Sequence, residues 1–133
     1  TDIDVALQFL TNAIKKRCTA FLISDFIDNH DFFKSMSIAN KKHDLAAIQV
    51  YDRRDAEMPD VGLIRLRDME TGADRWIDTS SKKVRKAYAK EWYARQQKLS
   101  STVNRSGVDL AQITTDEDFV KALLGLFRRR GMK

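Results

Sequence analysis

Aspartates gather after an apolar segment in the first quarter of the sequence, where carboxylates of this kind can ligate a metal ion. Asp25 follows the run Phe21-Leu22-Ile23-Ser24, and Asp28 and Asp31 come soon after it. Metal and ligand sites of open α/β sheets lie at the carboxyl ends of the strands, and Mg²⁺ prefers carboxylate oxygens. We therefore predict that Asp25 ligates a metal, directly or through water; capping of the following helix is the alternative. Asp52, after the next apolar run, is a second candidate for the same crevice.

The other reactive residue types form no catalytic pattern along the chain. His30 and His43 have no partner at metal-ligand spacing, and Cys18 has no neighbouring base. The five glycines are isolated, so no phosphate-binding loop is indicated. The segment Asp78-Thr79-Ser80-Ser81 is similar to a metal-binding Asp-x-Ser-x-Ser motif, but Lys82 occupies its last position and we interpret it as a helix cap. No enzymatic activity is expected from these residues.

The elements that must position these residues alternate between helix and strand. Helical spacing of apolar residues predicts helices over 3–17, 31–42, 82–103 and about 116–130, and apolar runs predict strands over 19–25, 45–51 and 108–113. An alternating segment at 61–78 predicts a β-hairpin insertion with its turn at 69–72. Gly107 is a stop signal after the 82–103 helix. This order predicts an α/β fold with three layers, in which helices cover both faces of a Rossmann-like open parallel sheet.

Four local expectations follow from the same patterns. The run at 19–25, which is continuously apolar before Asp25, is expected to be buried on both faces. The cations Lys15-Lys16-Arg17 are expected in the last turn of the first helix, where they complement the helix dipole. The last helix is expected to begin with a cap at Thr115 or Asp116. Its inward side chains are expected to be Phe119, Leu123, Leu126 and Phe127.

Composition limits the class of protein. The 133 residues carry a formal net charge of +5, 43% are hydrophobic and 32% are charged, which suits one globular domain. The sequence lacks a signal peptide and an apolar run of the roughly 20 residues that span a bilayer. A single cysteine, Cys18, excludes an internal disulfide. These observations favour a cytoplasmic protein.

Positive charge is concentrated in the second half of the sequence. Residues 1–66 carry 9 Lys and Arg against 10 Asp and Glu, whereas residues 67–133 carry 15 against 9. Eight basic residues and one acidic residue, Glu91, fall between 82 and 105. This helix can contact nucleic acid, contact an acidic protein, or be a solvated face. Tyr88 and Trp92 fall on its apolar stripe, which argues against base stacking.

Several ordered blocks resemble the bacterial family called domain of unknown function 58, a divergent von Willebrand factor A-like family. The blocks run from 21 to 26, 47 to 55, 59 to 64, 68 to 72, 78 to 80, 107 to 110 and 127 to 130. The resemblance implies that 1–133 is a single, partial domain, the C-terminal half of a von Willebrand A-like fold. The strands at 19–25, 45–51 and 108–113 would then be the fourth, fifth and sixth of its sheet.

The resemblance also implies a metal site and a function. Of the adhesion-site ligands of the von Willebrand A-like fold, only the aspartate after the fourth strand has a counterpart, Asp25, so Mg²⁺ is the one cofactor implied and its other ligands would lie upstream. Family members are associated with MoxR-type AAA+ ATPases. The implied function is a non-enzymatic interaction module that acts as an adaptor in assembling other protein complexes.

Two other functions stay open at this point. One is nucleic-acid binding or nuclease-like activity through the basic 82–105 helix, and the other is a metal-dependent hydrolase that uses Asp25, Asp28 and Asp31. A further expectation concerns assembly. If the strand at 19–25 lacks its usual neighbour, the exposed sheet edge should pair with another copy or with a longer chain.

Overall fold

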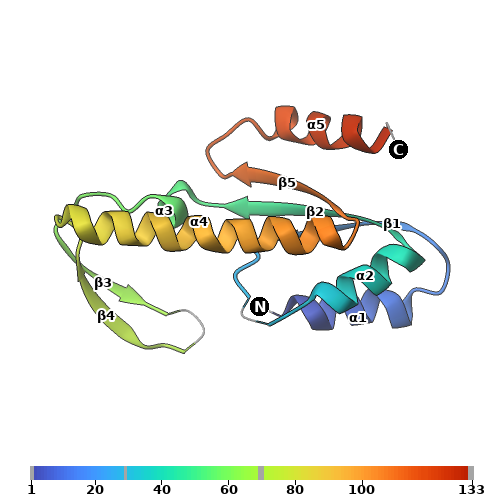
Figure 1. Cartoon of the computed structure of the whole chain (residues 1–133), viewed down its shortest axis with the longest axis horizontal. Coiled ribbons are helices and arrows are strands. Elements are labelled where there is room, and N and C mark those ends of the chain that lie inside the picture. Colours follow the sequence, from blue (N-terminus) through green and yellow to red (C-terminus); the bar gives the residue numbers. More distant parts are fainter. Residues whose placement is uncertain (1, 29, 69–70, 132–133) are drawn as a thin grey trace. The chain divides into compact units, whose positions relative to one another are not determined.

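The computed structural model describes residues 2–28, 30–68 and 71–131, and its elements follow the predicted order except for one short helix, α3, that was not predicted (Figure 1). The chain divides into two compact units. Unit 1 comprises residues 1–51 and 97–133, and unit 2 comprises residues 52–96. The long helix α4 (Lys82–Arg105) runs from the second unit into the first. No helix within the described ranges has the length and apolar character needed to cross a membrane.

A three-stranded parallel sheet organises unit 1. Its strands β1 (Thr19–Ser24), β2 (Asp44–Tyr51) and β5 (Asp109–Thr114) lie in the order β1-β2-β5. Thr19 pairs with Asp44 and Ala46 pairs with Asp109, so the three strands begin at the same edge of the sheet. The predicted Rossmann-like α/β architecture is confirmed. The order is also the one expected for the fourth, fifth and sixth strands of a von Willebrand A-like sheet.

Helices cover both faces of this sheet. On one face, α1 (Ile3–Ala13), α2 (Phe33–Lys42) and the C-terminal end of α4 bury Leu7, Met36 and Val103 against Leu45 and Ala47 of β2. On the other face, α5 (Phe119–Gly131) packs Leu126 against Ile48 and Ile113. The central strand β2 is therefore buried on both faces, because it alone has a neighbour on each side and helices above and below.

Helix α4 ends just before Gly107, the residue that the sequence predicts as its stop signal. Gly107 has φ +80°, a left-handed conformation that glycine adopts without a steric penalty. The N–H of Val108 donates to the carbonyl of Val103 (3.2 Å), and the N–H of Gly107 donates to that of Asn104 (3.0 Å). These two bonds form a Schellman motif, with Val108 and Val103 packed in the same core cluster. The motif turns the chain directly into β5.

Unit 2 contains the predicted hairpin. Strands β3 (Leu63–Arg67) and β4 (Asp74–Asp78) are antiparallel, with Leu63 opposite Asp78, and the short helix α3 (Arg53–Ala56) precedes them. The turn predicted at 69–72 lies partly outside the described residues, which resume at Thr71. The buried Thr79 ties the base of the hairpin together, because its N–H donates to Gly62 and its hydroxyl accepts from Val61 (3.0 Å). The predicted helix cap is confirmed: Ser81 accepts from the N–H of Val84.

Three local expectations were wrong. Helix α1 ends at Ala13, and the side chain of Lys42 caps the carbonyl of Thr11, so the cations at 15–17 lie beyond the helix. Strand β1 alternates between exposed and half-buried residues because α5 packs on β5 and leaves β1 uncovered on that face. Helix α5 begins later than expected, where Asp118 accepts from the N–H of Val120.

Two of the four α5 side chains that were expected to face the sheet do not. Leu126 is fully buried and Leu123 is half-buried, as expected. Phe119 and Phe127, however, are 58% and 51% exposed, which contradicts the prediction that both point inward. A helix that covers only β2 and β5 has a narrow contact stripe, and these two rings fall at its margins.

Candidate functional site

Hydrogen bonds between side chains and backbone connect the three strands of the sheet near their carboxyl ends. The amide of Gln112 on β5 donates to the side chain of Gln49 on β2 (3.2 Å), and the buried Gln49 donates to the backbone carbonyl of Asp25 (3.3 Å). Parallel strands bring their carboxyl ends to one edge, which is where open α/β sheets bind ligands. The edge formed by the carboxyl ends of these strands is therefore the candidate location of a ligand-binding site.

The loop after β1 holds Asp25 in an exposed position. One oxygen of its carboxylate accepts from the N–H of Ile27 (3.0 Å), which closes a tight turn. The next residue, Phe26, has φ +58° although it carries a large side chain. Burial of the Phe26 ring against Phe32 (6.2 Å between centroids) offsets that cost. In this structure Asp25 closes a turn in the loop and does not cap the following helix α2, which begins at Phe33, and its metal role stays a prediction.

The other predicted aspartates also accept backbone hydrogen bonds. Asp31 accepts from the N–H of Phe33 (3.0 Å) at the start of α2. Within unit 2, Asp52 accepts from the N–H of Arg54 (2.8 Å), and Asp55 accepts from the N–H of Asp52 (3.0 Å), which forms a capping box on α3. The structure does not bring Asp25 and Asp31 into a common cluster of metal-ligating atoms within the ranges it describes.

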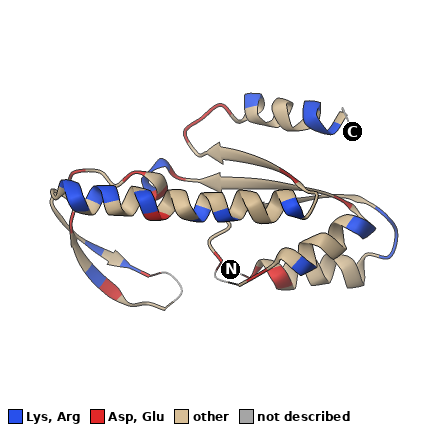
Figure 2. Ribbon diagram, in the orientation of Figure 1, with Lys and Arg blue, Asp and Glu red and all other residues tan. Residues whose placement is uncertain are grey.

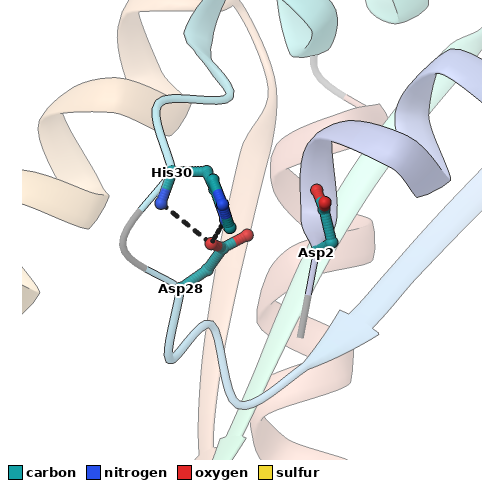
Figure 3. A group of neighbouring side chains, drawn as sticks. All are labelled: Asp2, Asp28 and His30. Atoms are coloured by element: carbon teal, nitrogen blue, oxygen red, sulfur yellow. Dashed lines mark hydrogen bonds and ion pairs between the residues drawn. The ribbon is translucent and has the colours of Figure 1, made fainter. Parts of the chain in front are cut away.

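One cluster of ligand-type atoms does form, from Asp2, Asp28 and His30 (Figure 3). Their side chains each place one oxygen or nitrogen within 4.8 Å of the others. The Asp28 carboxylate is fully buried, accepts from the N–H of Ile3 (2.8 Å) and from that of His30 (2.9 Å), and lies 2.6 Å from His30 Nδ1. Asp2 accepts from the N–H of Val5. The group thus binds the N–H groups at the first turn of α1.

Electrostatic effects explain why the carboxylates of Asp2 and Asp28 lie at the N-terminus of α1. Burial is the largest single effect on the Asp28 carboxyl and raises its pKa, but the N–H groups of Ile3 and His30 and the His30 ring together lower the pKa below its usual value. The N-terminus of a helix carries partial positive charge, which stabilises carboxylates and disfavours a cation. The cluster therefore acts as a helix cap.

The structure also joins Cys18 and His43, which the sequence does not suggest because they are 25 residues apart. The backbone N–H of Cys18 donates to His43 Nδ1 (3.1 Å), and the Cys18 thiol lies 3.4 Å from the same nitrogen. Both residues immediately precede a parallel strand, and the pairing of Thr19 with Asp44 brings them together. The fully buried His43 accepts a backbone hydrogen bond here, at the edge opposite to the one that holds Asp25.

A groove opens on the α5 face near the carboxyl ends of the strands, with a volume of about 400 Å³. Its walls are mostly apolar side chains of the three strands and α5. They are Ile23, Ile48, Val50, Ile113, Phe119 and Leu123, and Thr114 at the end of β5 with Thr115 and Glu117 of the following loop completes the lining. Ile23 is 63% exposed, and Phe119 is exposed to a similar extent. The groove arises because α5 leaves the outer strand β1 uncovered.

The loop after β5 carries three consecutive acidic residues, Asp116, Glu117 and Asp118, of which Glu117 lines the groove; this segment is called the acidic rim below. Burial raises the pKa of Tyr51 at the end of β2, and the negative charges of Glu117 and Asp116 raise it further. Glu117 and Asp116 thus bring negative charge near the end of β2. Sequence patterns alone missed the groove, because it depends on where α5 packs.

The basic residues expected on the long helix lie along α4 (Figure 2). The hydroxyl of the half-buried Tyr88 donates to the carbonyl of Arg54 (3.0 Å) within unit 2. Burial raises the pKa of Tyr88, and the charge of Asp55 raises it further. Tyr93 on α4 and Trp76 on β4 are more than 60% exposed.

Comparison with known proteins identifies relatives of the chain. The family model described as "Protein of unknown function DUF58" matches residues 1–98. "Uncharacterized protein MAV169" of Mycobacterium avium is 30% identical over 132 residues, which are 98% of this chain and 78% of that protein. "Uncharacterized protein Rv1480" of Mycobacterium tuberculosis shows the same identity, but the chain spans only 41% of its length. No solved structure shows a significant match to the chain.

Proposed function

This chain belongs to the DUF58 family of proteins of unknown function, and from that premise we propose that it is a non-enzymatic protein–protein interaction module. The observation that carries the proposal is the apolar groove between α5 and the sheet, with its acidic rim. Most of the groove's surface consists of aliphatic and aromatic side chains, which suit an apolar side chain of a partner.

The chemistry of the groove defines the partner. Ile23 and Phe119 expose apolar surface that a leucine- or phenylalanine-type anchor would cover, at roughly 25 cal/mol per Å² removed from water. Asp116, Glu117 and Asp118 at the rim favour lysine or arginine beside that anchor. The partner is therefore a protein segment with an apolar anchor and a basic flank.

Resemblance to von Willebrand A-like adaptors supports a more specific role. We propose that the partner is a MoxR-type AAA+ ATPase, and that the module serves it in the assembly or maturation of protein complexes. In such a fold Asp25 would be one ligand of a bound Mg²⁺, and a carboxylate of the partner could complete the coordination. Binding would then depend on the metal.

A pull-down with a MoxR-type ATPase from the same organism, with and without nucleotide and Mg²⁺, tests this proposal. Phe119→Ala should weaken capture roughly tenfold, since truncation of an anchoring aromatic costs more than about 1 kcal/mol. Phe9→Ala is the matched control, because Phe9 is 67% exposed on α1, away from the groove. Absence of capture in every nucleotide state, or equal loss in both variants, would refute the assignment.

Nucleic-acid binding is the second candidate function. Exposed Trp76 and Tyr93 favour it, together with the basic residues of α4, because nucleic-acid binding surfaces combine aromatic rings with cations. Fluorescence anisotropy with DNA and RNA at two salt concentrations tests it. Phosphate contacts should weaken steeply as salt rises. Absence of salt-sensitive binding at the lower concentration would eliminate this function.

A further inference from the structure

The hairpin of unit 2 has two faces of different composition (Figure 1). Residues that lie opposite each other in an antiparallel pair point to the same face. One face therefore consists of three pairs, which are Leu63 with Asp78, Arg65 with Trp76 and Arg67 with Asp74. We call it the outer hairpin face, and all of its residues are exposed. The other face carries Ile64, Leu66 and Ile77, which are half-buried, so the apolar packing of the hairpin uses that face.

Two large apolar side chains lie together on the outer hairpin face. Leu63 is 65% exposed and Trp76 is 64% exposed. Leu63 pairs with Asp78, which is two residues along β4 from Trp76, so the two apolar side chains are diagonal neighbours. Arg65 lies opposite Trp76, but its guanidinium binds Asp74, and within the described ranges the indole stacks on no other ring or cation. This apolar area is therefore open for contact with another molecule.

Positive charge borders the apolar area on the side toward the hairpin turn. The guanidiniums of Arg65 and Arg67 both bind the carboxylate of Asp74, which Arg67 Nε reaches at 3.2 Å. Because a guanidinium has several N–H donors, one shared carboxylate leaves donors of both arginines available for a further acceptor. At the opposite end, Asp78 already accepts from the N–H (3.1 Å) and the hydroxyl (2.6 Å) of Ser80. The outer hairpin face thus combines an apolar area with neighbouring guanidinium donors.

We propose that the outer hairpin face docks a protein segment that lays an apolar side chain on Leu63 and Trp76 and a carboxylate on the guanidiniums of Arg65 and Arg67. Tryptophan and arginine are among the side chains that most often dominate the binding energy of protein interfaces. Arginine also binds carboxylates through two parallel hydrogen bonds, which fixes the orientation of the segment. The occupant is an acidic segment with an apolar anchor.

This surface is separate from the groove and selects a segment of the opposite charge. All residues that line the groove belong to unit 1, and all residues of the outer hairpin face belong to unit 2. The groove, with its acidic rim, favours a basic flank, whereas Arg65 and Arg67 favour an acidic one. The chain therefore has two binding surfaces, as an adaptor that connects two partners requires.

A nucleic-acid strand can also stack a base on Trp76, but the charges of the outer hairpin face favour a protein segment. Asp74 and Asp78 lie on this face with Arg65 and Arg67, so carboxylates and guanidiniums are equal in number. A phosphate backbone binds along a row of cations and would meet both carboxylates. A protein segment can place one carboxylate on the two arginines and leave Asp78 uncontacted.

Fluorescence titration of the full chain with synthetic peptides tests the proposal. The probe is a peptide in which a leucine–phenylalanine pair is followed by alternating glutamates. Its binding should bury the indole of Trp76 and shift the emission to shorter wavelength. Two matched peptides, one with lysine for glutamate and one with serine for the apolar pair, should bind at least about tenfold more weakly. Trp76→Phe should abolish the shift, because only the half-buried Trp92 then remains.

Two substitutions that each remove one positive charge separate the hairpin from the basic helix α4. Arg65→Gln should weaken binding of the acidic peptide roughly tenfold, whereas Lys90→Gln, at an exposed position of α4, should weaken it less than about twofold. Leu63→Ser tests the apolar contact without altering charge and should also weaken binding. Hydrogen exchange at Ile64 and Ile77, which pair across the hairpin, establishes that the variants keep the hairpin folded.

Several results would overturn the proposal. They are equal binding of the three peptides, no shift of the Trp76 emission, equal losses in Arg65→Gln and Lys90→Gln, and a stronger shift with single-stranded DNA or RNA than with the acidic peptide. The comparison of peptides uses the unsubstituted chain, so it holds even where a variant unfolds. Phe119→Ala should leave these titrations unchanged, so this proposal and that of the groove can fail separately. Loss of acidic-peptide binding in Phe119→Ala would also overturn the assignment to the hairpin.

Discussion

The backbone N–H of Cys18 donates to Nδ1 of His43 across 3.1 Å, at the point where β1 and β2 begin. This bond fixes the neutral His43 ring in the tautomer that carries its proton on Nε2, because Nδ1 must accept. His43 Nε2 is buried, and no hydrogen-bond partner for it lies within the described part of the chain. The ring is thus a structural acceptor that aligns the amino-terminal ends of two parallel strands.

His43→Ala should lower the free energy of unfolding of unit 1 by about 3 kcal/mol. The substitution leaves a cavity and removes the acceptor of a buried N–H. His43→Asn should lose less, since the Asn side-chain oxygen can occupy the position of Nδ1. Cys18→Ala should also lose less, because the backbone N–H remains. Urea unfolding of the three variants measures the differences, and equal losses would contradict the role of this bond.

Arg130 near the end of α5 contacts the amino-terminal ends of β2 and β5. Its guanidinium forms ion pairs with Asp44 and with Asp109 (3.6 Å) and donates to the carbonyl of Leu45 (3.4 Å), and its side chain is only 14% exposed. Arg130→Ala should lower the free energy of unfolding by about 2 kcal/mol, since charged hydrogen bonds shielded from water are lost.

Arg128→Ala is the matched control on the same helix, because Arg128 is exposed. It should change the free energy of unfolding by less than about 0.5 kcal/mol. Thermal unfolding of the two variants compares them directly. The sequence suggests that all three terminal arginines serve the helix dipole, and that interpretation alone would predict similar effects for both.

Asp28 makes the stability of the α1 N-terminus depend on pH. Its pKa is lowered from the usual 3.8, so the folded state favours the carboxylate. The resulting stabilisation is present above the usual pKa and is lost as the pH falls through the lowered value. Asp28→Asn removes the ionisable group, so the difference in stability between wild type and variant should shrink in acid.

Unfolding midpoints measured between neutral pH and strong acid check this prediction. His30→Ala should move the loss to higher pH, because the His30 ring helps to lower the Asp28 pKa. A difference between wild type and Asp28→Asn that does not vary with pH would contradict it.

Two glycines should respond in opposite directions to alanine. Gly107→Ala should destabilise the protein by about 1 kcal/mol or more, because φ is +80° and the new methyl would lie 3.1 Å from the Asn40 amide nitrogen. Gly125 lies inside α5, and a methyl there would meet only the Arg129 guanidinium, at 3.7 Å. Gly125→Ala should stabilise by roughly 0.5–1 kcal/mol through helix propensity. Calorimetry of both variants tests the opposite signs.

The sequence by itself determined the order and type of every element except the short helix α3, which no apolar periodicity indicates. Apolar periodicity is a local property, so helices, strands and the hairpin were predicted to within a few residues, and Gly107 marked the end of α4 because a left-handed residue was needed there. Family resemblance likewise rested on local blocks, and the family match over residues 1–98 confirmed it.

Only the tertiary structure decided which surfaces are covered and which side chains meet. Helix α5 packs over β2 and β5 and leaves β1 open, which exposes Phe119 and Phe127 and creates the groove. Strand register brings Cys18 to His43, although 25 residues separate them. Both depend on contacts between distant segments, which no local pattern encodes. One face of β1, which the sequence predicted to be buried, is exposed for the same reason.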